Sequence, residues 1–451
     1  MKDETGRQRV IIEGVEPEID CGRFPIKRTV GEKVIVEADA FTDGHDAISC
    51  LLLHRPALKS GSRAALRWNE VPMEALANDR WRAEFIPAEI GRWIYTVTAW
   101  VDRFKTWRRD LKKRVGAGQD VSVDLLIGAE LIREAAERAR ESKKKADARV
   151  LDGLAAGLST ALAMEDELSE LMERHADRFH SSIYGKELEI VVDRERARFS
   201  SWYEFFPRSA GTFRDAERRL AYAADMGFDV VYLPPIHPIG RTFRKGPNNN
   251  PESQPGDLGS PWGIGAEEGG HKDIHPELGT IEDFRRFVAR AGELGIEIAM
   301  DVAFQASPDH PYVREHPEWF RKRPDGTIQY AENPPKKYQD IYPFDFDTEA
   351  WKPLWQELKS VFDHWIGEGI RIFRVDNPHT KPFPLWEWLI TEVKRDHPDV
   401  IFLSEAFTRP KIMYRLAKIG FTQSYNYFPW RNTRWELAEY FTELTQTKVR
   451  E

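Results

Sequence analysis

The sequence predicts an α/β protein in which about six βα units follow an N-terminal β-sandwich and a helical insertion. Three observations predict this order. Short β-branched and aromatic runs begin the 451-residue chain, a proline-free stretch rich in Ala, Leu, Glu, Arg and Lys follows, and strands then alternate with helices. We place the three parts at residues 1–117, 118–190 and 191–451.

Composition excludes several classes of protein. The chain has 66 Lys and Arg against 74 Asp and Glu, a net charge of −8, which is not the basic balance of a nucleic-acid-binding protein. No apolar run approaches the roughly 18 residues of a membrane span, and residues 1–14 lack the apolar core of a secretory signal. The only cysteines, Cys21 and Cys50, rule out a disulfide scaffold. We therefore expect a cytoplasmic globular protein without nucleic-acid or membrane partners.

Strand candidates at short intervals predict the sandwich. Turn residues such as Asp43-Gly44, Asn78-Asp79 and Gly91 separate them, and no helical periodicity interrupts them. The candidates are RVIIEGVEPEID, KVIVEADAF, AISCLLLHR, WRAEFIPAEI and GRWIYTVTAW.

Apolar residues at helical spacing predict a helical hairpin or bundle over 118–190. The charged patch ERARESKKKADAR between them is typical of a solvated face or a helix end. Two roles remain open for this bundle, a purely structural one and a dimer contact. The periodic residues are Leu131, Ile132, Ala135, Ala136, Ala139, Leu151, Leu154, Leu158, Leu162, Leu168, Leu171 and Met172.

Repeated β-then-α units predict a parallel sheet with right-handed crossovers in 191–451, either open or closed into a barrel. Two long insertions, 237–279 and 304–349, interrupt the alternation, and loops of that length are usually functional. The predicted strands are 199–206, 230–234, 297–302, 371–376, 401–405 and 424–428. The predicted helices are 213–226, 281–294, 350–368, 385–396 and 411–418.

Carboxylates end several of these apolar strands, among them Asp301, Asp376 and Glu405. Arg374 lies two residues before Asp376, so both side chains point to one face of the strand, where the cation would hold Asp376 ionised as a nucleophile needs. Glu405 ends an apolar strand, and a drier setting suits a proton donor. Two carboxyl groups about 5–5.5 Å apart would serve a retaining glycosidase mechanism.

These strand ends resemble those of the α-amylase superfamily, in the order DVAFQ (301–305), FRVDNPH (373–379) and FLSEAF (402–407). Longer motifs are similar to the maltose-1-phosphate maltosyltransferases of bacterial α-glucan synthesis, and the similarity covers essentially the whole chain. Those motifs are GRTFRKG (240–246), DVAFQASPDHP (301–311), NPPKKYQDIYP (333–343), RVDNPHTKP (374–382) and LSEAFTRP (403–410).

The resemblance implies a (β/α)8-type TIM barrel and an α-retaining transfer of maltose from α-maltose 1-phosphate to the non-reducing end of an α-1,4-glucan. Asp376 would be the nucleophile, Glu405 the acid and base, and Arg374 the residue that holds Asp376 ionised. It implies a homodimer. We expect no cofactor and no metal, because His237, His271 and His275 do not show tight metal spacing and fit substrate or core roles better than zinc binding. By the same resemblance, the residues around the phosphate would be Lys245, Gln305, Lys336, Tyr338 and Asn377.

Departures from amylases favour this subfamily. Amylases typically carry Asn-His shortly after the first Asp, where this chain has Gln305-Ala306, and a His four residues after the nucleophile, where it has Thr380. The family also has a third carboxylate after its seventh strand, an eighth strand and a C-terminal β domain, which we do not find. We therefore expect residues 1–451 alone to be a partial barrel that is inactive and poorly stable.

Two other functions remain as alternatives. A hydrolase or sucrose-type transferase of the same superfamily would share the carboxylate pair and lack acceptor-dependent release of phosphate. A non-catalytic sugar-binding or scaffold protein would form no covalent intermediate. The presence of both Asp376 and Glu405 argues against the second, since a degenerate relative would often lose one.

Overall fold

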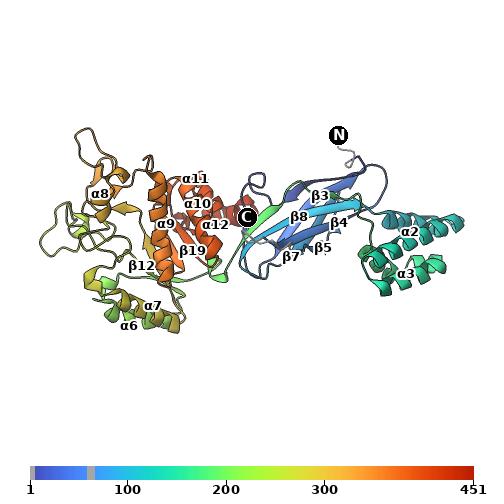
Figure 1. Ribbon diagram of the computed structural model, residues 1–451, viewed down its shortest axis with the longest axis horizontal. Coiled ribbons are helices and arrows are strands. Elements are labelled where there is room, and N and C mark those ends of the chain that lie inside the picture. The colour runs from blue at the N-terminus through green and yellow to red at the C-terminus, as the bar shows by residue number, and fades with distance from the viewer. Residues whose placement is uncertain (1–5, 58–66) are drawn as a thin grey trace. The chain divides into compact units, whose positions relative to one another are not determined.

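The computed structural model describes residues 6–57 and 67–451, which form two compact units (Figure 1). One unit ends at Val191 and the other runs from Val192 to Glu451, with residues 89–91 grouped with the second. Within the described residues, no helix has both the length and the apolar character that crossing a membrane requires.

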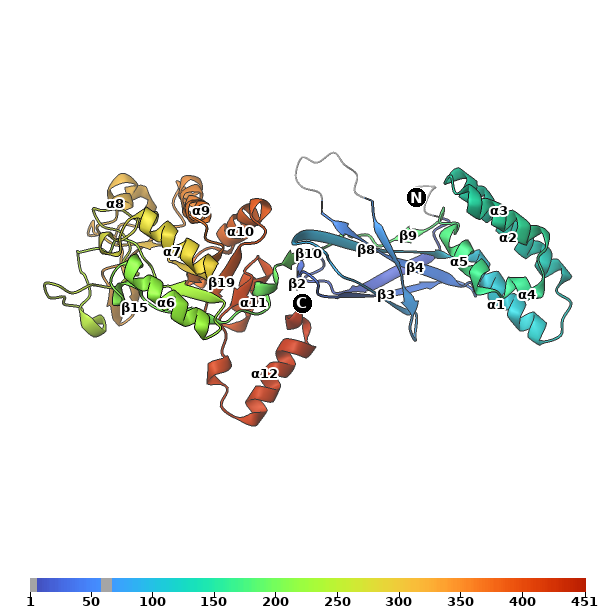
Figure 2. The same ribbon diagram turned by 90° about the horizontal axis from the view of Figure 1, so that it is seen from below.

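Two β-sheets form one part of the first unit (Figure 2). The side chains of His54 on β4 and Phe85 on β7 stack at 4.0 Å between ring centroids, so the two sheets are in contact. One sheet has the order β1 (Val10–Glu16), β3 (Val34–Thr42), β7 (Arg80–Phe85) and β6 (Glu74–Ala75). The other has the order β2 (Ile26–Thr29), β10 (Leu188–Asp193), β8 (Gly91–Val101), β4 (Ile48–Pro56) and β5 (Asn69–Pro72), with β9 (Ser182–Ile183) also on β8.

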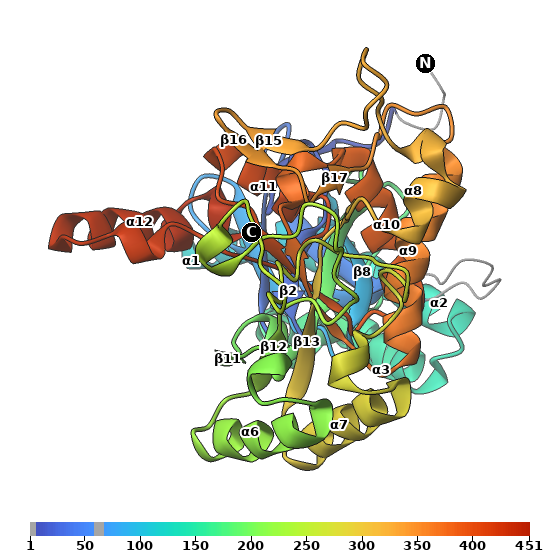
Figure 3. The same cartoon turned by 90° about the vertical axis from the view of Figure 1, so that its left-hand side faces the viewer.

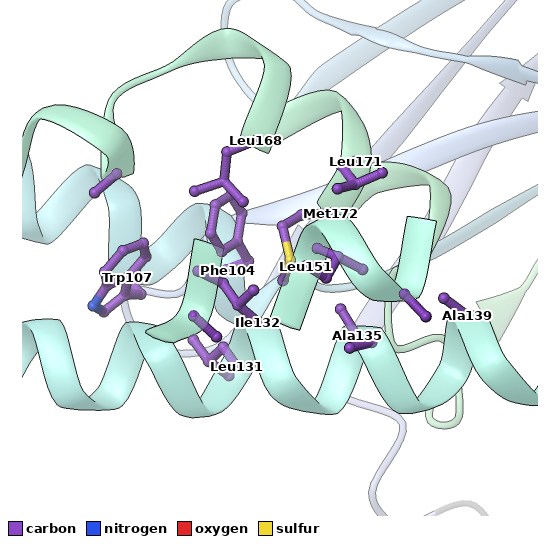
Figure 4. Close-up of a cluster of buried hydrophobic side chains, with 14 of the residues drawn as sticks. Phe104, Trp107, Leu131, Ile132, Ala135, Ala139, Leu151, Leu168, Leu171 and Met172 are labelled. Carbon is purple, nitrogen blue, oxygen red and sulfur yellow. The ribbon is translucent and has the colours of Figure 1, made fainter. Parts of the chain in front are cut away.

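Five helices at one end of these sheets enclose a separate apolar core (Figure 4). Phe104, Trp107 and Leu111 bury one face of the first helix against Ile132 and Leu151, which are fully buried on the next two. The helices are α1 (Arg103–Gly116), α2 (Ser122–Glu141), α3 (Lys145–Ala156), α4 (Thr160–Ala163) and α5 (Asp166–Arg174).

Two segments of the first unit differ from the prediction. Residues 103–116, predicted as part of the sandwich, form α1, because Phe104, Trp107 and Leu111 recur at helical spacing. Conversely, β9 and β10 fall in the range predicted as helical. The run LEIVVD in β10 is rich in β-branched residues, which favour a strand.

A single sheet of parallel strands organises the second unit. Its order is β11 (Trp202–Glu204), β12 (Val230–Leu233), β13 (Glu297–Val302), β18 (Ile372–Asp376), β19 (Ile401–Glu405) and β20 (Gln423–Ser424). The predicted strands 297–302 and 401–405 are confirmed to the residue, whereas β11 and β20 are shorter than predicted. The intervening helices are α6 (Phe213–Asp225), α7 (Ile281–Glu293), α9 (Trp351–Gly367), α10 (Phe383–Asp396), α11 (Pro410–Lys418) and α12 (Arg434–Gln446).

The two insertions follow β12 and β13 and fold against each other (Figure 3). The Ser307 N–H donates to the Ile264 carbonyl, and the N–H groups of Arg241 and Thr242 both donate to Asp309. The second insertion contains two short antiparallel strand pairs and a helical turn. These are β14 (Gln305–Ala306) with β17 (Tyr342–Pro343), β15 (Ala331–Asn333) with β16 (Lys336–Tyr338), and α8 (Pro311–Glu315).

Candidate active site

Parallel register brings the predicted carboxylates to one edge of the sheet. Asp301 on β13 pairs in register with Arg374 on β18, and Asp376 on β18 pairs with Glu405 on β19. The apolar residues of β13 and β18 are buried on both faces, as expected for a covered parallel sheet. The charged side chains therefore gather where the strands end, which is where barrel and open α/β enzymes place their sites.

Arg374 is the centre of the cluster. Its Nη1 donates to Asp301 Oδ2 at 2.6 Å and to Asp376 Oδ1 at 2.9 Å, while its Nη2 lies 3.5 Å from Glu405 Oε2. Its guanidinium carbon also lies 5.8 Å from the ring centroid of Tyr232. One planar cation thus fixes three carboxylates, a task that suits the rigid donor fork of arginine.

Asp301 is the most deeply buried carboxylate of the cluster, with 1% of its surface exposed. The Tyr232 hydroxyl donates to Asp301 Oδ2 at 2.6 Å, and Oδ1 has no hydrogen-bond partner among the described residues. Burial raises the pKa of Asp301 to about 7, and the nearby Arg374 opposes that shift. Burial also raises the pKa of Tyr232, so this phenol remains a donor.

Glu405 is half-buried beside Asp376 and has the properties of a proton donor. Burial raises the pKa of Glu405 above its ordinary value, with Arg374 acting in the opposite direction. The Asn377 N–H donates to Glu405 Oε2 at 3.2 Å, and Asn377 Nδ2 donates to Asp376 Oδ2 at 3.3 Å. Asn377 makes both contacts from the left-handed region, at φ 43° and ψ 52°.

Lys381 is a second cation, next to the turn that Asp376 and Asn377 begin. Its Nζ donates to the backbone carbonyls of Asn377 at 3.2 Å and Asp376 at 3.4 Å. Burial lowers the pKa of Lys381 to about 8, although Asp376, Asp301 and Glu405 all raise it. The lysine therefore braces the backbone that carries Asp376 and Asn377.

The remaining residues predicted around the phosphate lie in the two insertions. Lys245 is buried, with its Nζ 3.8 Å from Asp340 Oδ1, and Gln305 donates from Nε2 to the Trp262 carbonyl at 3.1 Å. Lys336 is exposed on β16 and Tyr338 is half-buried on the same strand. Within residues 6–57 and 67–451, no hydrogen bond joins these four side chains to the carboxylate cluster, so the structure brings together only Arg374, Asp376, Asn377 and Glu405 of the predicted set.

Three members of the cluster are not among the predicted site residues. Asp301 is predicted only to end a strand, although it shares Arg374 with Asp376. Tyr232 is the one polar residue in the strand VVYL, and this is the sequence signal that could identify it as a site residue. Lys381, five residues after Asp376, gave no signal, because its contacts depend on the turn between them.

The described part of the chain contains no candidate metal site, since no group of three or more His, Cys, Asp or Glu there could hold an ion. Of the histidines considered as possible ligands, His237 and His271 are buried, with ring nitrogens bonded to the Asp273 and Ala303 carbonyls, respectively. The carboxylate cluster can support covalent chemistry: one carboxylate is held by Arg374 beside a second whose pKa burial raises.

Comparisons with known proteins agree in identifying one family. A family model described as alpha-1,4-glucan:maltose-1-phosphate maltosyltransferase, domain N/S, matches residues 8–194. The protein of that name from Myxococcus xanthus is 54% identical over 454 residues, covering 98% of this chain and 68% of the relative. The one from Chlorobaculum tepidum is 53% identical, covering 99% and 67%.

Solved structures also match the chain. The crystal structure of an alpha-amylase from Lactobacillus plantarum is 25% identical, with a TM-score of 0.46, and the match covers 56% of this chain and 60% of that one. The family assignment depends on the closer relatives, which match this chain almost from end to end. The chain therefore belongs to the alpha-1,4-glucan:maltose-1-phosphate maltosyltransferase family.

Proposed function

We propose that the protein transfers a maltosyl unit from α-maltose 1-phosphate to the non-reducing end of an α-1,4-glucan by a retaining double displacement. One observation carries the mechanism: Asp376 and Glu405 are register partners on neighbouring parallel strands and share Arg374. Adjacent strands lie about 4.8 Å apart. That spacing suits the carboxyl separation of about 5–5.5 Å used by retaining enzymes.

The first half-reaction forms a maltosyl-enzyme. An oxygen of the Asp376 carboxylate attacks the anomeric carbon while the bond from that carbon to the phosphate oxygen breaks. Glu405, whose pKa burial raises, donates its proton to the leaving phosphate. Arg374 stays paired with Asp301 and Glu405 as Asp376 loses its negative charge by forming the ester bond.

The second half-reaction reverses these roles. Glu405, now ionised, removes the proton from the 4-hydroxyl of the acceptor glucose, and that oxygen attacks the anomeric carbon. The bond to Asp376 breaks and its carboxylate is restored. Two inversions at the same carbon leave the α configuration unchanged.

Phosphate recognition is proposed for Lys245, Gln305, Lys336, Tyr338 and Asn377. Support comes from their chemistry, since lysine ammonium groups and amide and phenol donors all hydrogen-bond to phosphate oxygens. Asn377 already lies between Asp376 and Glu405, where the leaving group must sit. The others lie in insertions that follow β12 and β13 directly.

The finer architecture is proposed in the same way. The second unit would be a (β/α)8-type barrel domain, 191–451, of which this chain supplies about six units. The sandwich would comprise the two sheets of the first unit, including β9 and β10, and the helical insertion would run from α1 to α5. The chain spans about two thirds of the length of its relatives. We also propose a homodimer in the cytoplasm, where free thiols such as Cys21 and Cys50 are stable.

Binding and discharge experiments on a chain extended C-terminally to the length of its relatives test this function. Maltose 1-phosphate should bind the Asp376→Asn variant about tenfold or more tighter than maltose in calorimetry, because the phosphate adds charge-assisted hydrogen bonds. A maltosyl-enzyme made from α-maltosyl fluoride should discharge faster when maltohexaose is added, giving a lengthened glucan. Equal affinities would argue against the donor, and discharge to free maltose alone would indicate a hydrolase.

A further inference from the structure

A pair of buried histidines connects the two insertions. His271 in the first insertion and His310, which caps α8 in the second, are each 2% exposed, and His271 Nδ1 lies 3.0 Å from His310 Nε2. Their ring centroids are 5.0 Å apart. The mechanism proposed above uses neither side chain.

The outer contacts of the pair fix which nitrogen carries each proton. His310 Nδ1 accepts from the Tyr312 N–H at 3.0 Å, so in the neutral ring Nε2 must be the donor. His271 Nε2 lies 3.0 Å from the Ala303 carbonyl, which only accepts, so Nε2 carries the proton and Nδ1 is free to accept. A chain of three hydrogen bonds thus runs from Tyr312 through His310 and His271 to Ala303.

Two glycines leave room for this arrangement. A Cβ at Gly270 would overlap His310 Nε2, and a Cβ at Gly265 would overlap the side chain of the same histidine. Gly265 also has a φ of +104°, which other residues rarely adopt. The backbone of the first insertion is therefore shaped to receive the ring of His310.

The chain of hydrogen bonds ends at the exit of β13. Ala303 lies between Asp301, which pairs with Arg374, and Gln305, which donates to the Trp262 carbonyl. Ser307 adds two hydrogen bonds between the insertions. Its hydroxyl donates to the Gly265 carbonyl, and its N–H donates to the Ile264 carbonyl. The histidine pair thus fixes the backbone on which Gln305 is carried.

We propose that His271 and His310 are positioning residues for the donor phosphate: as a neutral pair of fixed tautomers, they hold the segment 303–307 so that Gln305 faces the phosphate. This inference rests on the proposed function, which places Gln305 at that group. Neither histidine touches the reacting atoms, so they act through the segment that they hold.

The surroundings favour the neutral pair. Burial lowers the pKa of His271 to about 3 and that of His310 well below the ordinary 6.5, and the neighbouring histidines lower both further. Glu357 on α9, which opposes the shift at His271, is engaged by Lys272 and Tyr312. The charged or titratable groups around the pair are His237, Lys272, Asp273, Tyr312, Glu357 and His364.

Two substitutions at His310 separate positioning from helix capping. His310→Gln places an amide N–H near the position of Nε2 and can still donate to His271, whereas His310→Asn keeps an oxygen near Nδ1 and can only cap Tyr312. In the Asp376→Asn background, His310→Asn should weaken binding of maltose 1-phosphate about tenfold, the loss of one buried hydrogen bond, and His310→Gln much less. When the same two substitutions are made in protein that retains Asp376, adduct formation from α-maltosyl fluoride, which has no phosphate, should change little in either variant.

Equal losses in the two variants, or a loss confined to His310→Gln, would overturn the inference and leave the proposed function standing. If the unaltered site bound maltose 1-phosphate no better than maltose, the proposed function and this inference would both fail. A second measurement needs no substitution: ¹⁵N NMR of histidine-labelled protein should show both rings as neutral Nε2–H tautomers from pH 8 to pH 5. An Nδ1–H tautomer, or titration of either ring in that range, would also overturn the inference.

Discussion

Lys381 shows how burial changes the chemistry of a single residue. Its ammonium group is held against the Asp376 and Asn377 carbonyls, and burial lowers its pKa from 10.5 to about 8. Between these values the unfolded chain keeps a proton that the folded chain has lost. The unfolded state therefore binds more protons in this range, and the stability contributed by this residue must rise with pH.

We therefore expect the unaltered protein to gain stability relative to Lys381→Met as pH rises from about 8 to 10.5. Urea unfolding at a series of pH values measures the difference between the two, so that other titrating groups cancel. Lys411→Met, at an exposed position in the first turn of α11, provides the matched control and should show a constant difference. If the difference in unfolding free energy for Lys381→Met did not change with pH, the ammonium group would titrate as it does in water.

The grouping of Asp376 and Glu405 with Arg374 follows from local sequence signals, whereas other contacts around the site do not. Each carboxylate ends an apolar strand, and Arg374 lies two residues from Asp376, so the signal is local. The Tyr232–Asp301 and His271–His310 contacts join residues 69 and 39 positions apart. Such contacts depend on register and loop packing, which a short sequence pattern does not encode.

Helix boundaries in the second unit depend on local capping, which explains why the prediction was close there. In α7, Thr280 accepts from the Asp283 N–H while Asp283 accepts from the Thr280 N–H, a reciprocal capping box. The predicted 281–294 became Ile281–Glu293. In contrast, β11 covers only three of the residues predicted for 199–206, and Phe199, which is 74% exposed, lies outside it.

Removing this cap should destabilise the protein measurably. Thr280→Ala leaves the Asp283 N–H without its side-chain acceptor, and we expect a loss of about 1 kcal/mol in the free energy of unfolding. Thr391→Ala, at an exposed position inside α10, is the control and should be neutral or slightly stabilising, since Ala is the better helix former. Equal effects in both variants would show that the box contributes nothing.

At the scale of the whole molecule, stability and chemistry depend on different residues. Every side chain of the candidate site belongs to the second unit, whereas the helical core around Leu151 belongs to the first.

Leu151→Ala should lower the free energy of unfolding by about 2–5 kcal/mol because Leu151 is fully buried. The neighbouring Val150→Ala, 52% exposed, should cost far less. Below the unfolding transition, both variants should form the Asp376 adduct at the unaltered rate; a slower rate in Leu151→Ala alone would contradict this division.

The central claim is that Asp376 is the nucleophile, and α-maltosyl fluoride tests it most directly, because fluoride leaves without needing the acid. Intact-mass spectrometry of the protein, extended C-terminally to the length of its relatives and treated with this donor, should show one added maltosyl unit, and peptide mapping should place it on Asp376. The Glu405→Gln variant should retain the adduct longer, since no base activates the acceptor, and Asp376→Asn should show none. An adduct on another residue, or none on folded protein, would contradict the account.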